Sequence, residues 1–210
     1  MFGDSNFTGK ILFGEGKGTL GPALPGTGRF TPTLADLPAV DIQPLTDFST
    51  MVFAVGLNNI LKNEQAPHSI AMATHGFVKA ALDNNPALKI LLPGIIPTDS
   101  ETMNSRIDIY NTNLKNIASC LPRTTYLDVG FLKDTQGKLS SKFRADEARP
   151  IAIHLNRGGV SMLASRVKRA LRVLNDLPVT RTLQTNNSRS GFSRERAPNS
   201  GYRGRGGYRG

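Results

Sequence analysis

The sequence predicts an α/β fold, in which a parallel sheet is covered by helices on both faces. Three short apolar runs are typical of strands buried on both sides, and each ends at glycine or proline: 51–55, 88–92 and 124–129. Segments with helical spacing separate them. Because parallel neighbours need a crossover connection, this alternation favours a three-layer sandwich with one central sheet.

Two helical segments connect the three runs. The first, 68–82, places its apolar side chains on one face before Pro86 ends it: Ile70, Thr74, Phe77 and Ala81. The second begins near Thr98 and Glu101, whose spacing predicts a capping box. Its core face continues with Ile107, Tyr110, Leu114 and Ile117.

A last helix is predicted over residues 158–175. Its core-facing stripe consists of Val160, Leu163, Val167, Leu171 and Leu174. The opposite face is basic, with Arg166, Lys168, Arg169 and Arg172. Residues 14–50 are rich in glycine and proline, and we expect long loops there with room for one strand.

Composition divides the chain near residue 177. The 210 residues carry a formal net charge of +10, and the segment 180–210 holds seven arginines and one acidic residue, Glu195. A segment of Gly, Ser, Asn and Arg buries too little apolar surface to offset its ordering entropy. We therefore expect a folded domain over 1–176 and a disordered Arg/Gly-rich (RGG) tail over 177–210.

The cellular compartment is predicted from what the sequence lacks. A single cysteine, Cys120, excludes a disulfide framework and a cysteine-based zinc site. No apolar run reaches the roughly 20 residues of a transmembrane helix, and residues 1–4 do not resemble a signal peptide. We expect an intracellular protein, in the cytoplasm or the nucleus and not secreted. His68 and His75 have no carboxylates at metal-ligand spacing, so no metal and no other cofactor is expected.

Polar blocks stand where α/β sheets bind ligands, beyond the carboxyl ends of strands. Gly3-Asp4-Ser5-Asn6 opens the chain, and Gly56-Leu57-Asn58-Asn59 follows the first apolar run. His154-Leu155-Asn156 stands just before the last helix. The sheet topology would bring these three blocks to one edge.

Taken in order, the blocks resemble the SGNH (GDSL-like) hydrolase family, whose motifs are Gly-Asp-Ser, a lone Gly, Gly-x-Asn-Asp and Asp-x-x-His. The resemblance covers nearly all of residues 1–175 and implies a flavodoxin-like three-layer α/β/α sandwich. It implies that Ser5 is the nucleophile and His154 its general base, with Asn58 and Gly26 in the oxyanion hole. A serine hydroxyl needs such a base and such donors to attack an ester. The implied substrate is a carboxylic or lipid ester.

The chain departs from the family pattern in two places. Ile151 stands three residues before His154, where the family has aspartate, and Asp146 and Glu147 are the nearby carboxylates that could substitute. In the serine-protease template, loss of the orienting group lowers turnover by about 10⁴-fold, so an impaired site is expected. Only Met1 and Phe2 precede the Gly-Asp-Ser block, which predicts a truncated first strand. We expect the chain to be the downstream part of a longer protein.

The end of the tail has the composition of segments that bind RNA or other single strands, with arginine for phosphate and tyrosine for base stacking. The candidate binding residues are Arg194, Arg196, Tyr202, Arg203, Arg205, Tyr208 and Arg209. A hydrolase-like domain with such a tail resembles the esterase-type first-open-reading-frame proteins of some non-LTR retrotransposons, on residues 53–59, 92–97, 126–128 and 153–156. That resemblance implies a role in packaging RNA. The alternative is a tail that only keeps the protein in solution.

Three functions stay open at this point: an active ester hydrolase, a non-catalytic nucleic-acid-binding or assembly protein built on a degenerate hydrolase fold, and a flavodoxin-like ligand-binding module. Ser5 could cap the segment that follows it, and Asn58 could close a turn. His154 could be a satisfied histidine at the entrance of the last helix. Residues 16–21 match Gly-x-Gly-x-x-Gly, but Pro22 and Pro25 prevent the helix that a dinucleotide site needs.

Overall fold

A computed structural model describes residues 2–3, 29–30, 48–62, 65–145 and 150–178 of the chain. The chain divides into two compact units, 1–179 and 180–210, and all of these residues belong to the first. The predicted RGG tail beyond residue 178 lies outside the described residues. In chain order the elements are β1 (Phe2–Gly3), β2 (Arg29–Phe30), β3 (Thr50–Ala54), α2 (Leu57–Lys62), α3 (Pro67–Asn84), β4 (Lys89–Pro93), α4 (Glu101–Cys120), β5 (Thr124–Leu127), the 3-10 helix η3 (Gly130–Leu132) and α5 (Arg157–Leu174).

The strands form one parallel sheet in the order β2-β1-β3-β4-β5. In register, Phe2 of β1 lies beside Phe53 of β3, and Met51 lies beside Ile90 of β4. Chain order 2-1-3-4-5 is the flavodoxin-like arrangement, and the predicted fold class is confirmed. The described part of β1 comprises Phe2 and Gly3.

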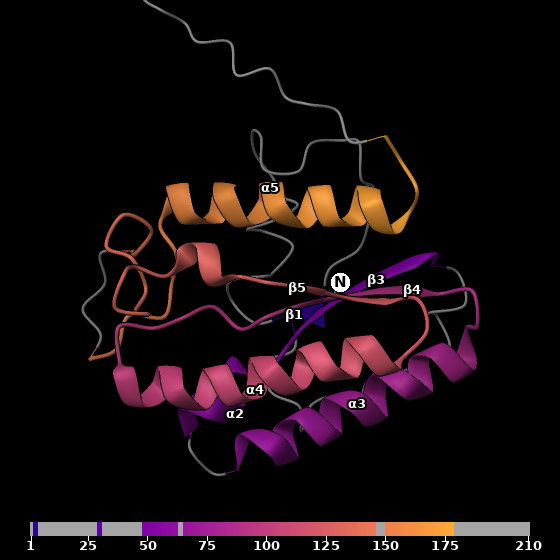
Figure 1. Ribbon diagram of the computed structural model, residues 1–210, viewed down its shortest axis with the longest axis horizontal. Coiled ribbons are helices and arrows are strands. Elements are labelled where there is room, and N and C mark those ends of the chain that lie inside the picture. Colours follow the sequence, from indigo (N-terminus) through magenta and orange to yellow (C-terminus); the bar gives the residue numbers. More distant parts are fainter. Residues whose placement is uncertain (1, 4–28, 31–47, 63–64, 146–149, 179–210) are drawn as a thin grey trace, which may run out of the picture. The chain divides into compact units, whose positions relative to one another are not determined.

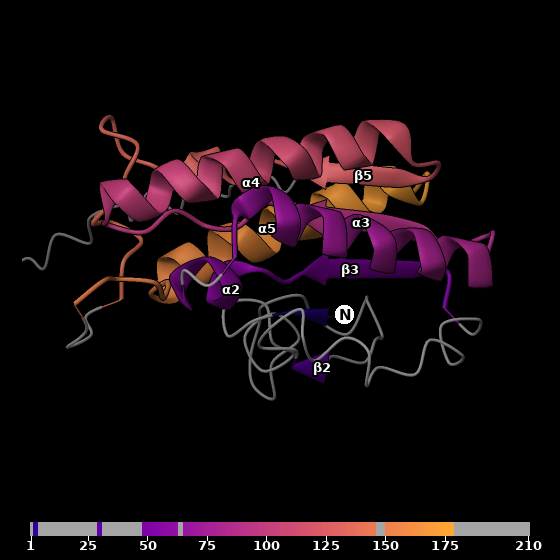
Figure 2. The ribbon, with the colours of Figure 1, turned by 90° about the horizontal axis from the view of Figure 1, so that it is seen from below.

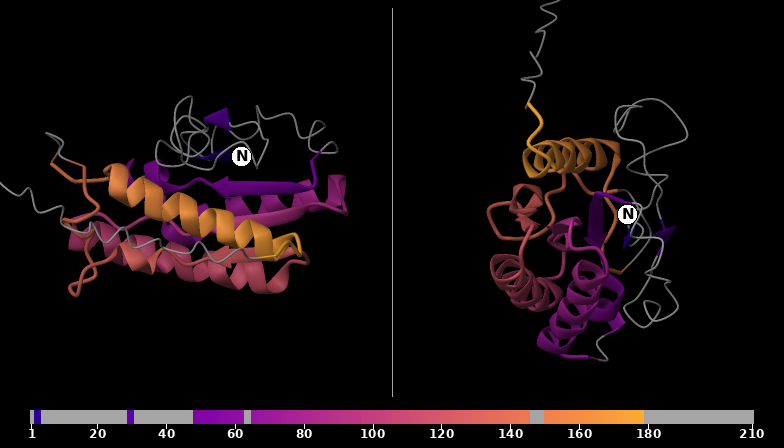
Figure 3. Two further views of the ribbon diagram at one scale, coloured as in Figure 1. Left: turned by 90° about the horizontal axis from the view of Figure 1, so that it is seen from above. Right: turned by 90° about the vertical axis from the view of Figure 1, so that its right-hand side faces the viewer.

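Helices cover both faces of the sheet. Helices α3 and α4 lie on one face and α5 on the other, as the side view in Figure 1 and the end view in Figure 3 show. Alternate residues of β3 divide accordingly, because successive side chains of a strand point to opposite faces. Met51, Phe53 and Val55 enter the core beneath α3 and α4, whereas Val52 and Ala54 enter the core beneath α5. The continuous apolar run therefore supplies two cores at once.

The predicted helical stripes are the buried faces of the observed helices. In α3, Ile70, Thr74 and Ala81 are buried, and the ring of Phe77 stacks on Phe53 with 5.0 Å between centroids. The stripes of the other two helices are also buried or packed against the cores, with Ile107, Tyr110 and Leu114 in α4 and Leu163, Val167 and Leu171 in α5.

Two local predictions differ from the structure. The capping box at Thr98 is wrong, because Ser100 is the N-cap of α4 and its hydroxyl accepts a hydrogen bond from Met103 N at 3.4 Å. Thr98 instead accepts from Ser100 N and bonds the buried side chain of Asn104. Helix α2 was not predicted; Figure 2 shows this short helix at one end of β3, beside α3 and α4. Its six residues are too few to give a helical period.

Candidate active site

The predicted oxyanion residue Asn58 lies directly after β3, in a segment called here the Asn58 turn, which consists of Gly56 and the first turn of α2. Gly56 occupies φ +127°, a conformation that side chains rarely adopt, and its carbonyl accepts the first helical hydrogen bond from Ile60 N at 3.0 Å. Asn58 is thereby placed in the first turn of α2, half-buried, directly beyond the carboxyl end of β3. The alternative of a simple closing turn does not hold, since Asn58 and Asn59 both belong to the helix.

Tyr110 of α4 fixes this turn through a hydrogen bond to the backbone just before Gly56. Its hydroxyl lies 2.9 Å from the carbonyl oxygen of Val55 and 2.9 Å from Oγ1 of Thr74, and both side chains are fully buried. Only the hydroxyl can donate to the carbonyl, so Tyr110 donates to Val55. The single hydroxyl hydrogen of Thr74 is then shared between Tyr110 and the carbonyl of Ile70, which lies 3.2 Å away. A Cβ atom on Gly56 would lie 2.9 Å from the Tyr110 hydroxyl. The tyrosine thus fits only a glycine at position 56.

His154, the predicted general base, lies in the segment that leads into α5. Its carbonyl accepts a hydrogen bond from Ala145 N at 3.0 Å, and Asn156 N donates to the carbonyl of Phe143 at 2.8 Å. Two residues later the side chain of Asn156 caps α5 by accepting from Gly159 N at 2.9 Å. His154 is half-buried, and its backbone is fixed on both sides.

Asp99 ties the His154 segment to the sheet. It lies in the loop after β4, where one carboxylate oxygen accepts from Ala152 N at 2.8 Å and the other from Arg144 at 3.4 Å. The same loop contacts the Asn58 turn, since the Cδ1 atom of Ile95 lies within 3.2 Å of where a Cβ of Gly56 would be. The turn, the β4 loop and the His154 segment therefore form one connected assembly at the carboxyl edge of the sheet. The sequence interpretation missed Asp99, although its place beyond a strand end is the signal that singled out the other blocks.

The β4 loop is itself held by two asparagines of α4. Asn111 brackets Ile95, accepting from its backbone N at 2.8 Å and donating to its carbonyl at 3.0 Å. Asn104, which is buried, accepts from Thr98 N at 2.7 Å and donates to the Thr98 carbonyl at 2.9 Å. These bonds satisfy backbone groups that would otherwise be buried without partners, and they fix the loop that carries Asp99.

The side chain of Ile151, which stands where the SGNH pattern has aspartate, packs against the apolar core. Its side chain is partly buried and packs against the core beneath α3 and α4, beside the buried Ile153. The position where the SGNH pattern has a carboxylate is therefore part of the apolar core.

Ser5, Gly26, Asp146 and Glu147 lie outside the described residues, as do Arg194, Arg196, Tyr202, Arg203, Arg205, Tyr208 and Arg209. Of the predicted catalytic set the structure locates Asn58 and His154, on two segments that the β4 loop connects.

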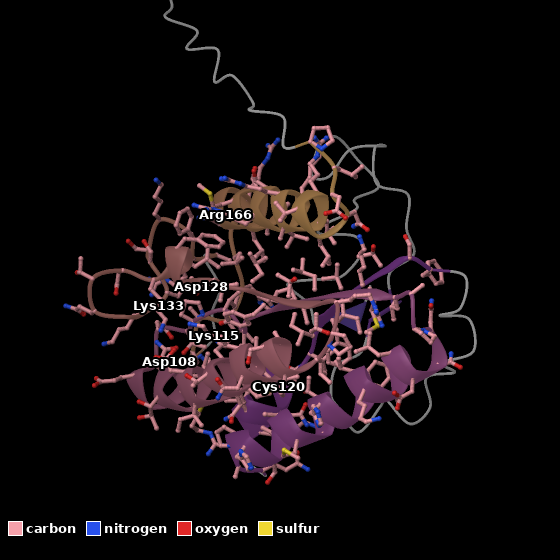
Figure 4. The ribbon with its side chains drawn as sticks, turned by 45° about the vertical axis from the view of Figure 1, so that its right-hand side comes forward. Asp108, Lys115, Cys120, Asp128, Lys133 and Arg166 are labelled. Carbon is pink, nitrogen blue, oxygen red and sulfur yellow. The ribbon has the colours of Figure 1, made fainter. Side chains whose placement is uncertain are left out.

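A second polar cluster lies between α4 and the end of β5. Lys133 pairs with Asp108 at 2.6 Å, and Figure 4 shows both side chains on the α4 side of the molecule, near Asp128. Burial, and then the carboxylates of Asp128 and Asp108, raise the pKa of Tyr126 to about 12. The phenol therefore stays protonated at neutral pH, where it is neither a base nor a nucleophile.

Neither a metal site nor a membrane span is found in the described part of the chain. No three His, Cys, Asp or Glu side chains gather there as metal ligands would. None of the helices described is long and apolar enough to cross a membrane.

Comparisons with known proteins support the fold. No family model and no curated protein sequence matches the chain. Solved structures do match. A Streptococcus pneumonia protein assigned provisionally as a platelet activating factor aligns with a TM-score of 0.62 at 19% identity, over 81% of either chain. Est24, a carbohydrate acetylesterase from Sinorhizobium meliloti, aligns with a TM-score of 0.58 at 15% identity, over 82% of this chain and 97% of its own.

A third structure agrees with these two. A carbohydrate esterase of family 3 from Talaromyces cellulolyticus aligns with a TM-score of 0.55 at 15% identity, over 85% of this chain and 98% of its own. The chain shares the fold of SGNH-type esterases. At these identities the likeness concerns the fold.

Proposed function

We propose that the protein is an SGNH-type carboxylic-ester hydrolase whose activity is weakened by the missing orienting aspartate. The observation that carries the proposal is the assembly at the carboxyl edge of the sheet, where the Asn58 turn, the β4 loop and the His154 segment are connected. Ser5 follows β1 by two residues in the sequence, and β1 pairs with β3. The nucleophile is therefore expected at the same edge, in a fold that carbohydrate esterases also have.

The proposed reaction is a two-step acyl transfer. Ser5 Oγ bonds to the acyl carbon while its proton passes to His154, and the oxyanion accepts hydrogen bonds from the Asn58 amide and the Gly26 and Ser5 backbone N–H groups. The bond to the leaving alcohol breaks as His154 returns the proton to that oxygen. Water then attacks the acyl carbon, gives its proton to His154, and releases the acid while Ser5 recovers its hydrogen.

Ester turnover by the full chain, compared with Ser5→Ala, tests this proposal. With a short-chain acyl ester we expect the wild type to be faster than Ser5→Ala by about 10²-fold, because loss of a serine nucleophile costs about 10⁶-fold and the missing orienting group has already cost about 10⁴-fold. Equal rates in two folded proteins would eliminate the enzyme hypothesis.

The weakening can be tested at position 151. Ile151→Asp is expected to raise the rate by supplying a carboxylate three residues before His154, and Ile151→Asn, of the same size without the charge, is the matched control. If Asp146 already serves as the orienting acid, Asp146→Asn lowers the wild-type rate and Ile151→Asp restores it. A gain that is equal in the Asp and Asn variants would show that the charge is irrelevant.

The second candidate is a non-catalytic protein that binds or packages RNA, as in the retroelement proteins that the sequence resembles. The packing of Ile151 favours this second candidate, because the position of the orienting carboxylate is occupied by an apolar side chain that packs against the core. In this proposal residues 1–176 are a scaffold and the tail, 177–210, holds RNA. Replacing Arg203, Arg205 and Arg209 by glutamine should then weaken binding to a single-stranded RNA and flatten its salt dependence, whereas unchanged binding would exclude a role for the tail end.

A further inference from the structure

We propose that the outer face of α5 binds the phosphate backbone of single-stranded RNA, independently of the ester chemistry and of the tail. This surface, called here the α5 cationic face, consists of Arg157, Arg166, Lys168, Arg169 and Arg172. It spans residues 157–172, about 22 Å at 1.5 Å per residue.

The charge of α5 is one-sided in a way that its packing does not require. Its 18 residues contain five Lys or Arg and no Asp or Glu. The inner face, with Leu163, Val167 and Leu171, packs against the sheet and would do so whatever the outer face carried. By contrast, α3 and α4 contain equal numbers of acidic and basic residues. The positive charge is therefore concentrated on one side of the sheet.

Three of these arginines are exposed, and none of the three is paired with a carboxylate of the described residues. Among the residues that the structure describes, the ion pairs lie elsewhere, and no described carboxylate lies within 4.0 Å of the guanidinium groups of Arg157, Arg166 or Arg169. Arg166 lies over the ring of Phe131, 5.1 Å from its centroid, and Figure 4 shows it on α5. A guanidinium on the surface can donate two parallel hydrogen bonds to one phosphate group.

The chemistry of the face favours nucleic acid over a membrane. A helix that lies on a membrane inserts its apolar side into the lipid, but the apolar side of α5 is already buried against the sheet. The exposed apolar residues on α5, Met162 and Val173, lie 11 positions apart, which is about 16 Å, too far to form one insertion patch. Four of the five cations are arginine, the side chain whose fork matches phosphate.

Single-stranded RNA is the occupant that the neighbouring sequence supports. The chain that follows α5 holds seven arginines in 180–210, interspersed with glycine and tyrosine, which is the composition of segments that bind single strands. The α5 cationic face offers the same phosphate-binding side chains within the part of the chain that the structure describes.

The test measures binding of the full chain to a fluorescent 20-nucleotide single-stranded RNA, by anisotropy at several salt concentrations. The variant Arg157→Gln/Arg166→Gln/Arg169→Gln keeps the tail intact. Each phosphate contact to a single strand contributes a slope of about 0.7 in log K against log salt. Loss of three contacts is expected to lower the slope by about 2 and the affinity at 0.1 M salt by about 100-fold.

The matched control removes three positive charges from the opposite side of the sheet, in Lys62→Gln/Lys79→Gln/Lys115→Gln. It has the same net charge as the α5 variant, and because salt screens charges beyond about 10 Å we expect its affinity to fall less than 3-fold. Equal losses in the two variants would reduce the effect to net charge and overturn the proposal, as would unchanged affinity in the α5 variant. Binding of the full chain to phosphatidylserine vesicles that the α5 substitutions weaken more than RNA binding would assign the face to a membrane instead.

Discussion

The two faces of the sheet are built by different means. Beneath α3 and α4, the apolar core also contains buried polar side chains. Thr74 is hydrogen-bonded to Tyr110, and Tyr110 donates to the backbone carbonyl of Val55. Beneath α5, the buried side chains are apolar, and the charge of that helix lies outside. The first face therefore positions a turn at the candidate site, while the second leaves a surface for a partner.

This contrast separates residues that hold the fold from residues that are available for binding. A polar group in the first layer is satisfied by another part of the chain, so its removal should cost stability. A charge on the outside of α5 has no such internal role, so its removal should cost binding and leave the fold intact. Substitutions on the two faces are expected to differ in size and in sign.

The largest effect is expected at Gly56. Gly56→Ala forces a side chain into φ +127° and brings its Cβ to 2.9 Å from the Tyr110 hydroxyl, so we expect the free energy of unfolding to fall by about 3 kcal/mol. The matched control is Gly76→Ala in the middle of α3, where no atom lies within 4 Å of the new Cβ. That substitution should stabilise the protein by about 0.5–1 kcal/mol. Urea unfolding measures both, and a loss of the same size at the two glycines would contradict the role given to the turn.

The next effect tests the buried hydroxyl chain. Tyr110→Phe leaves the carbonyl of Val55 without its side-chain donor, which should cost about 2 kcal/mol. Thr74→Val removes the donor to Tyr110, and because the two hydroxyls act as one chain we expect the double variant to cost about 1 kcal/mol less than the sum of the single ones. Additive losses would mean that the two groups stabilise the turn separately.

The fold could be predicted because its signals are local and repeated. Apolar runs such as 51–55 end at glycine or proline, and the helices between them carry apolar residues at helical spacing, as Ile107, Tyr110 and Leu114 do. Parallel topology follows from the length of the connections. The N-cap of α4 was misplaced because Thr98 and Ser100 are both good capping residues. In the structure Thr98 donates hydrogen bonds to the buried side chain of Asn104, and Ser100 caps the helix instead.

The candidate site could be predicted only in part. Motif order singled out Asn58 and His154, but nothing in the sequence shows that Asp99 bonds the backbone of Ala152, 53 residues away. The contact depends on how two loops meet in space, and a single sequence carries no such information. Tyr110 was predicted as a core residue from its spacing, and its hydroxyl, which fixes the turn, has no signal of its own.

Alkaline pH offers a test of the polar cluster on the α4 side. The pKa of Tyr126 is about 12 in the folded protein, because of burial and the nearby carboxylates, and about 10 in an unfolded chain. The phenol of the unfolded chain ionises first, so this contribution to stability is complete below pH 10 and is lost as pH rises from 10 to 12. Tyr126→Phe should therefore flatten the fall of the urea midpoint over this range. Asp128→Asn keeps an acceptor for Gly130 N and should flatten this fall less, because burial is the larger cause of the raised pKa of Tyr126. If Tyr126→Phe leaves the alkaline fall of the urea midpoint unaltered, that fall belongs to other groups.

The smallest effect is expected when a single surface charge is removed, and the change in the free energy of unfolding should have opposite signs on α5 and on α3. Arg157 is the first residue of α5, where a cation opposes the helix dipole, and Arg169 has Arg166 and Arg172 three positions away on either side. Arg157→Gln and Arg169→Gln should each raise the free energy of unfolding by about 0.3 kcal/mol at low salt. Lys79→Gln on α3 should lower it by a similar amount, because Lys79 pairs with Asp83 at 2.6 Å.

Urea unfolding at 20 mM and 1 M NaCl measures these differences, which should shrink at high salt because the charges are exposed. Losses of stability in both α5 variants would show that the arginines serve the fold, and the contrast between the two faces would fail. If the same variants gain stability and lose RNA affinity, the arginines lower the free energy of unfolding but contribute to RNA binding. Such a cost is expected only where the charges meet a partner, since repulsion along α5 is relieved when phosphates lie between the arginines.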